Sequence, residues 1–174
     1  MGEAVEAAAV ETWALPEGEW LAGMVRAYVG SSVLLTDAAG EVLLLKASYR
    51  PQWEFPGGGM DPGEGPAQCA ARELAEETGL AAGELRLLVV EWRDPIPDQG
   101  EHAHPAVHFM FDGGTAPAGA ELRLQAEEIA DHGWYTPARA AALLHPCAAR
   151  RLTAALEARR TGVPVLLHST GYLG

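Results

Sequence analysis

Three glutamates on one short segment have the side-chain type and spacing of a cation site. Glu73, Glu76 and Glu77 follow a run of three glycines, Gly57–Gly59. In a helix, at about 100° per residue, these carboxylates fall within roughly a 100° arc of one face. Carboxylates and the carbonyls of a closely approaching glycine backbone are the ligands that Mg²⁺ prefers. A solvated acidic face is the commoner fate of charge runs, but the glycine run favours a metal site.

Few residues nearby can offset the repulsion among the three glutamates. Like charges at i, i+3 and i+4 destabilise an isolated helix by about 0.2–0.5 kcal/mol per pair. Arg72 is the one arginine nearby, and with Glu76 it forms a pair of opposite sign at i, i+4. The sequence therefore predicts that a bound cation offsets most of the repulsion.

The helix that carries the glutamates has clear limits. Pro66 is a typical first helical residue, and Gly79 after Thr78 is a typical stop. The helix should therefore span about three turns. Its other face is small and apolar and should lie against a sheet. That predicted face consists of Ala67, Ala71, Leu74, Ala75 and Thr78.

The remaining segments predict a layered α/β domain with a mixed sheet. Apolar runs bounded by turn residues indicate strands, and the two Ala-rich runs that begin near a proline indicate helices. The predicted strands are 24–36, 41–46, 53–56, 84–93, 106–111 and 133–136, and the predicted helices are 137–144 and 146–160. We expect residues 1–20 to form an N-terminal arm, 21–160 the domain, and 161–174 a C-terminal tail.

Composition excludes several classes of protein. The chain has 174 residues and a net charge of −12, which disfavours binding to polymeric nucleic acid but allows a small anionic substrate beside a cation. The chain has no apolar run of the ~18 residues that a membrane span needs, and its acidic N-terminus lacks the basic region of a secretory signal. Cys69 and Cys147 lack metal-type spacing and are expected as free thiols in the cytoplasm.

A longer motif surrounds the glutamates. Gly58 is followed after five residues by Glu64, and "RELAEETGL" from Arg72 to Leu80 completes the pattern G-x5-E-x7-R-E-U-x-E-E-x-G-U, where U is apolar. This motif resembles that of the Nudix hydrolases. The resemblance covers roughly Val25 to Leu144.

The resemblance implies an α/β/α sandwich with a mixed sheet, with the helix of the motif packed against the sheet. It also implies cleavage of a diphosphate linkage in a nucleoside diphosphate derivative, with Mg²⁺ or Mn²⁺ as cofactor. The residues implied as metal ligands are Glu73, Glu76, Glu77 and the Gly57 carbonyl, and those that orient the carboxylates are Arg72 and Glu64.

The identity of the general base stays open. Glu73 and Glu76 are candidates, because one carboxylate must accept the proton of the attacking water. The family also uses a glutamate from a later loop, and Glu127 or Glu128 fits that role. Spacing does not choose among the four.

Histidines in "EHAHPAVH" suggest a second metal site through His102, His104 and His108. His104 and His108 would share a face only in a helix, and Pro105 with the following strand pattern argues against one. A loop at the rim of the substrate site is therefore favoured over zinc.

Substrate and assembly also stay open. Oxidised nucleotides, sugar nucleotides and ADP-ribose all fit, the last through prolines at Pro95 and Pro97. A nucleotide-sensing module or a prenyl-diphosphate isomerase on the same fold is the alternative, but the retained glutamates favour a hydrolase. The apolar segment 163–168 should cover a sheet edge or contribute to a homodimer.

Overall fold

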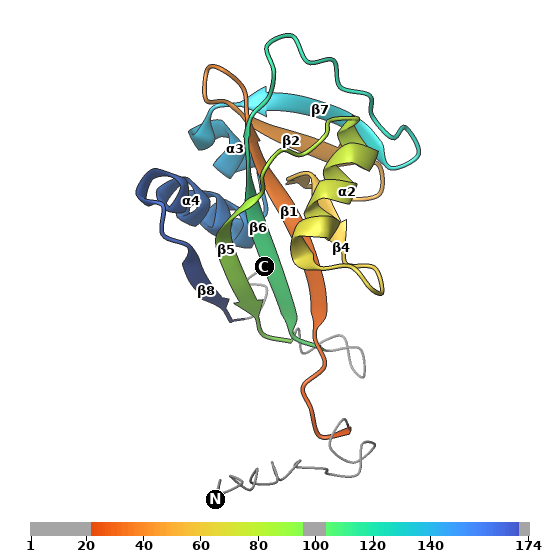
Figure 1. Cartoon of the computed structure of the whole chain (residues 1–174), viewed down its shortest axis with the longest axis vertical. Helices are drawn as coiled ribbons and strands as arrows, with labels where there is room; N and C mark the ends of the chain where they lie inside the picture. Colours follow the sequence, from red (N-terminus) through yellow and green to blue (C-terminus); the bar gives the residue numbers. More distant parts are fainter. Residues whose placement is uncertain (1–21, 96–103, 171–174) are drawn as a thin grey trace, which may run out of the picture.

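The structure is a computed structural model that describes residues 22–95 and 104–170. The described residues form one sheet and three helices (Figure 1). The strands are β1 (Tyr28–Thr36), β2 (Val42–Ala47), β3 (Trp53–Glu54), β4 (Gly57–Gly59), β5 (Arg86–Arg93), β6 (Ala106–Thr115), β7 (Ile129–Tyr135) and β8 (Val165–Ser169). The helices are α2 (Pro66–Thr78), α3 (Pro137–Leu143) and α4 (Pro146–Thr161).

The sheet is mixed, as predicted. Its main path runs β3-β2-β1-β6-β5-β8, while β4 pairs with β1 and β7 pairs with β2. The pairs β1–β6 and β5–β8 are parallel, and the other pairs are antiparallel. Strands β1, β6 and β5 therefore lie side by side in the centre and support both the glycine strand and the C-terminal strand.

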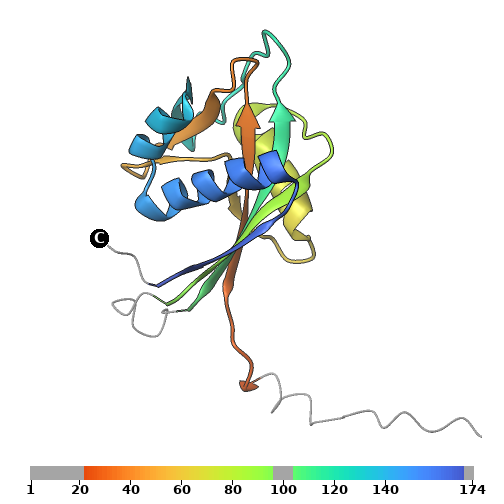
Figure 2. The same ribbon diagram turned by 90° about the vertical axis from the view of Figure 1, so that its left-hand side faces the viewer.

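Helices cover both faces of the sheet, which confirms the predicted α/β layering (Figure 2). Strand residues alternate between the two faces, so the core divides into two clusters. On the α2 face, Val33, Leu35, Leu43 and Leu45 pack with Ala70 and Leu74. On the α3 and α4 face, Leu34, Val42, Leu44 and Met110 pack with Ala140, Leu152 and Ala155.

Helix α2 begins and ends where the sequence predicts. Pro66 is its first residue, and Gly79 adopts φ 72° while its N–H donates to the Ala75 carbonyl. The predicted apolar face is partly wrong, because Ala67 and Ala75 are exposed. The buried residues of α2 are Cys69, Ala70, Leu74, Glu77 and Thr78. The helix is thus rotated so that one of the three glutamates faces the protein interior.

Several predicted strands differ in extent. The glycine run, for which no strand was predicted, forms strand β4 and pairs with β1 from Gly30 to Ser32. The strand predicted at 53–56 is limited to β3, and the strand predicted at 133–136 begins earlier, at Ile129. Backbone pairing with a neighbouring strand decides these limits, and side-chain patterns do not report it.

The C-terminal apolar segment extends the sheet. Strand β8 pairs with β5, from Val89↔Val165 to Arg93↔Ser169, and so covers that edge. Residues 1–21 lie outside the described part, so the division into arm, domain and tail stays a prediction. Among the described helices, none combines the length and apolarity that crossing a membrane requires.

Candidate active site

Arg72 lies beside the acidic group of α2, which consists of Glu73, Glu76 and Glu77, and bonds to two of its members. Its Nη1 donates to Glu73 at 2.9 Å and to Glu76 at 3.0 Å. Its Nη2 donates to Glu64 at 2.7 Å and to the Gly59 carbonyl at 3.0 Å. Arg72 therefore compensates more of the carboxylate repulsion than its single i, i+4 pairing with Glu76 suggests.

Glu64 bonds to Arg72 from the turn before α2. One of its oxygens accepts the Asp61 N–H at 2.7 Å, and both oxygens accept from Arg72. These hydrogen bonds favour the charged form and lower the Glu64 pKa to about 2. Glu64 thus stays ionised and orients Arg72 toward Glu73 and Glu76.

Glu77 lies in a different environment, on the buried side of the helix. It is only 8% exposed, and the Gly57 N–H donates to its Oε2 at 2.8 Å. Burial raises its pKa to about 8, and the nearby charges of Glu73, Glu54 and Glu128 add to the rise. Arg72 does not bond to Glu77, so this carboxylate is where positive charge is most lacking.

Glycine at position 58 lets the strand approach Glu73 closely. A Cβ added to Gly58 would lie 2.4 Å from Glu73 Oε1, so the Glu73 carboxylate would have to move away. On the opposite side, a Cβ added to Gly30 would lie 2.8 Å from the Gly58 carbonyl. Glycines at these two positions therefore let β4 lie close to both α2 and β1.

The chemistry of this acidic group fits a hard divalent cation. Its donors are carboxylate oxygens, and burial raises the pKa of both Glu73 and Glu77, so bound positive charge would relieve both. Within residues 22–95 and 104–170, no three His, Cys, Asp or Glu side chains converge as a ready-made metal cluster. The acidic group therefore fits a cation in donor type and in charge but not in arrangement. Arg72 bonds to Glu73 and Glu76, and the Gly57 N–H donates to Glu77.

The structure separates the two candidate loop glutamates. Glu128 lies close enough to raise the pKa of both Glu73 and Glu77 through its charge. The backbone carbonyl of Glu127 accepts the Ser48 hydroxyl at 3.4 Å. Of the two, Glu128 is therefore the one whose charge is seen to act on Glu73 and Glu77.

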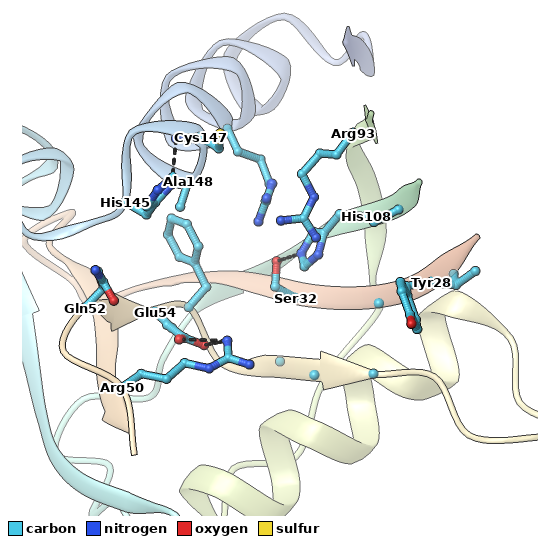
Figure 3. Close-up of a pocket in the computed structure, with 18 of the residues that line it drawn as sticks. Tyr28, Ser32, Arg50, Gln52, Glu54, Arg93, His108, His145, Cys147 and Ala148 are labelled. Carbon is cyan, nitrogen blue, oxygen red and sulfur yellow. Dashed lines mark hydrogen bonds and ion pairs between the residues drawn. The ribbon is translucent and has the colours of Figure 1, made fainter. Parts of the chain in front are cut away.

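A cavity of about 560 Å³ lies on the other side of β4 (Figure 3). All three glycines of β4 line it, as do Tyr28 and Ser32 of β1. In Figure 3, His145, Cys147 and Ala148 border it from the start of α4, whereas Arg50 and Glu54 lie near β4. Arg50 and Glu54 form an ion pair, with Arg50 Nη1 3.1 Å from Glu54 Oε1.

The histidine hypothesis is resolved only in part. His102 lies outside the described residues. His104 packs edge-on against the Tyr28 ring, with centroids 5.6 Å apart, whereas His108 lies in β6 with its Nε2 2.8 Å from Ser32 Oγ. The predicted strand after Pro105 is confirmed, and the two described histidines have different partners.

Sequence reasoning missed three of the four polar residues on the α4 side of the cavity, Ser32 of β1, Arg93 of β5 and Arg151 of α4. The fourth, His108 of β6, was singled out, but as a metal ligand. A charged residue inside an apolar strand pattern, as at Glu91 and Arg93, was the one signal that pointed to them. Both predicted free thiols, Cys69 and Cys147, are buried and free.

The chain is similar to known proteins in sequence and in fold. A putative 8-oxo-dGTP diphosphatase of Bacillus subtilis is 29% identical over 123 residues, which cover 71% of this chain and 76% of the relative. An RNA pyrophosphohydrolase of Pseudomonas paraeruginosa is 41% identical over 56 residues, which cover 32% of this chain and only 35% of that protein.

The fold is similar to that of the NUDIX domain of Shewanella oneidensis NrtR, solved in complex with ADP ribose. The TM-score is 0.62 at 20% identity, with 82% of this chain and 98% of that chain covered, so this similarity concerns the fold. The family model of the NUDIX domain matches residues 27–156, most of the chain, and the motif glutamates lie inside that range. The resemblance seen in the motif is thereby confirmed, and the chain belongs to the Nudix family.

Proposed function

We propose that the protein hydrolyses the diphosphate linkage of a nucleoside diphosphate derivative with the help of Mg²⁺ or Mn²⁺. Membership of the Nudix family, with relatives named as a diphosphatase and a pyrophosphohydrolase, makes the chain a hydrolase of phosphorus-containing anhydrides. The nucleotide substrate and the metal requirement are the proposed parts.

One observation carries this proposal. Glu77 is a buried carboxylate surrounded by other carboxylates, at a glycine strand whose other side borders a cavity. Buried like charges are unfavourable unless a cation or proton compensates them. A site that lacks positive charge beside a nucleotide-sized cavity suits a metal that arrives with an anionic substrate.

The residues that would hold the cation are Glu73, Glu76 and Glu77, with the Gly57 carbonyl as a further ligand. When bound, the cation supplies positive charge that neutralises the diphosphate and lowers the pKa of water. Arg72 holds Glu73 and Glu76 in place, and Glu64 keeps Arg72 oriented. The Gly57 N–H fixes the Glu77 carboxylate at the strand.

Proton acceptance falls to a carboxylate of this group. We propose Glu73, Glu76 or Glu128 for this role, and such general-base help is typically worth ~10²–10⁴-fold. Glu128 is exposed and comes from the segment just before β7, and its charge raises the pKa of both Glu73 and Glu77, which supports its place among these candidates.

The test is a panel assay with matched variants. Purified protein is incubated with Mg²⁺ and 8-oxo-dGTP, GTP, ADP-ribose or a sugar nucleotide, and products are separated by chromatography. We expect a nucleoside monophosphate from at least one substrate, with the activity lost in Glu77→Gln and kept in Glu121→Gln, an exposed control.

The same assay separates the alternatives. Tight nucleotide binding by calorimetry without any product would indicate a sensing module. Conversion of a prenyl diphosphate into its double-bond isomer would indicate the isomerase. Either result would overturn the proposed hydrolysis.

A further inference from the structure

A buried polar group lies beneath α4, on the cavity side of the sheet. Glu91 of β5 is fully buried, and Arg151 of α4 is 5% exposed. Arg151 donates to Glu91 Oε2 from Nε at 2.9 Å and from Nη2 at 2.6 Å. The Ser169 hydroxyl of β8 donates to the other oxygen, Oε1, at 2.6 Å. Three elements, β5, α4 and β8, thus meet at one carboxylate.

This group does not serve stability in an obvious way. Replacing a buried ion pair by apolar residues of similar size is often neutral or stabilising, because two charges must be desolvated. Cys147 and Ala148, one turn before Arg151 on α4, are small residues that line the same cavity as Arg151. The pair therefore invites a functional explanation.

One guanidinium nitrogen of Arg151 is available to a ligand in the cavity. Its Nε and Nη2 are taken by Glu91, while Nη1 makes no hydrogen bond within the described part of the chain. Arg151 also lines the cavity, so this fixed guanidinium presents donors to its interior. Because two bonds hold the planar group, a ligand pays little entropy to use the third nitrogen.

The surrounding wall is also rich in donors. Ser32 and His108 are hydrogen-bonded to each other beside Arg93, and all three line the cavity (Figure 3). Burial, together with the charges of Arg151 and Arg93, lowers the His108 pKa well below its usual value, so this histidine is neutral. Tyr28, Trp53 and Phe55 add flat apolar surface to the same cavity.

We propose that Arg151 is a specificity-determining residue that binds the exocyclic oxygen O6 of a 6-oxopurine nucleotide. It is held by Glu91, which Ser169 of β8 holds in turn. Aromatic lining suits a flat base, and a fixed guanidinium suits the acceptors O6 and N7 of guanine. Adenine presents an amino donor at the same position, which would face arginine donors. This inference rests on the proposed nucleotide substrate.

The inference gives the C-terminal strand a role in recognition. Strand β8 lies beyond residues 27–156, which the family model matches, yet Ser169 completes the bonding of Glu91. Arg150 also donates to Ser169 Oγ, at 3.4 Å, which ties the strand to α4 a second time. Glu91 and Ser169 are therefore positioning residues that act through Arg151.

The experiment measures binding, so that it does not depend on turnover. Calorimetric Kd values for GMP, IMP and AMP are compared in the parent, in the double variant Glu91→Gln/Arg151→Met, and in Arg160→Met. The double variant removes both buried charges together and keeps a partner for Ser169. Arg160 lies on the same helix, exposed and paired with Glu157, and is the matched control. Melting curves verify that each protein is folded.

The expected result is that the parent and Arg160→Met bind GMP and IMP about 10- to 100-fold more tightly than AMP. The double variant should bind all three with similar Kd. Ser169→Ala should reduce the ratio of AMP to GMP Kd values by about threefold. Where a substrate is turned over, these changes should appear in KM and not in kcat.

Equal binding of the three nucleotides by the parent, or no binding of any, would overturn the inference. A folded double variant that keeps the parent's preference would overturn it as well. A preference for GMP and IMP in a protein that cleaves nothing would support the inference and refute the proposed hydrolysis. Hydrolysis without any base preference would support the proposed hydrolysis and refute this inference.

Discussion

Replacing Glu77 with Gln tests the acidic site most directly, because the variant keeps size and hydrogen-bonding atoms while it removes one charge. The amide oxygen of Gln can still accept the Gly57 N–H that Glu77 accepts at 2.8 Å. The fold should therefore hold. Any change in metal binding or turnover then reports on the charge.

The structure gives the size of the effect on stability without metal. Burial raises the Glu77 pKa from 4.5 to about 8 in the folded protein. Between these pH values the folded chain keeps a proton that the unfolded chain has released, so stability falls as pH rises through this window. At 1.36 kcal/mol per unit, the ionised side chain destabilises the metal-free fold by about 5 kcal/mol near pH 8.5.

Three measurements follow from this reasoning. In EDTA, the melting temperature of the parent should fall between pH 6 and pH 8.5, and that of Glu77→Gln should fall less. Mg²⁺ should raise the parent's melting temperature at pH 8, since a ligand at 100 times its Kd stabilises by about 2.7 kcal/mol, and raise the variant's less. Turnover of any substrate found in the panel should drop by ~10²-fold or more.

Glu121→Gln is the control for a general effect of removing charge from a chain with a net charge of −12. It should behave as the parent in all three measurements. If Glu77→Gln keeps full activity and gains the same stabilisation from Mg²⁺, the reasoning about this carboxylate is wrong.

Three further predictions follow from the structure. Gly58→Ala should abolish activity while the protein stays folded, since its Cβ would lie 2.4 Å from Glu73 Oε1; normal turnover would contradict the close approach. Deleting residues from Gly162 onward should lower the melting temperature by several degrees, because it exposes the β5 edge and removes Ser169 from Glu91; unchanged melting would show that β8 is dispensable. His108→Gln should weaken the loss of stability as pH falls below 6.5, because the folded state resists protonation of this buried histidine; identical melting profiles between pH 5 and 7 would refute this.

Local features of the sequence determined the helix that carries the motif. Pro66 and Gly79 fix its ends through backbone conformation, and helical spacing places Glu73, Glu76 and Glu77 near one another. The strand patterns likewise predicted a mixed sheet with helices. These signals act over a few residues, so they can be read from the chain alone.

The tertiary structure decided what each of those residues faces. Packing against the sheet buries Glu77 and leaves Glu76 exposed. The small residues Cys69 and Ala70 lie on the same side of the helix as Glu77, and that side faces the sheet. The bonds of Arg72 to Glu64 and to the Gly59 carbonyl join residues 8 and 13 positions apart, which helical spacing does not relate.

The cavity shows the same limit over longer distances. Glu91 lies 60 residues from Arg151 and 78 from Ser169, and their meeting depends on the parallel pairing of β8 with β5 and on α4 crossing above it. Neither hydrophobic periodicity nor capping encodes such contacts, since both describe neighbours within a turn or a strand. The sequence by itself identified the acidic site, whereas only the folded chain assembled the donor-rich wall on the other side of the glycine strand.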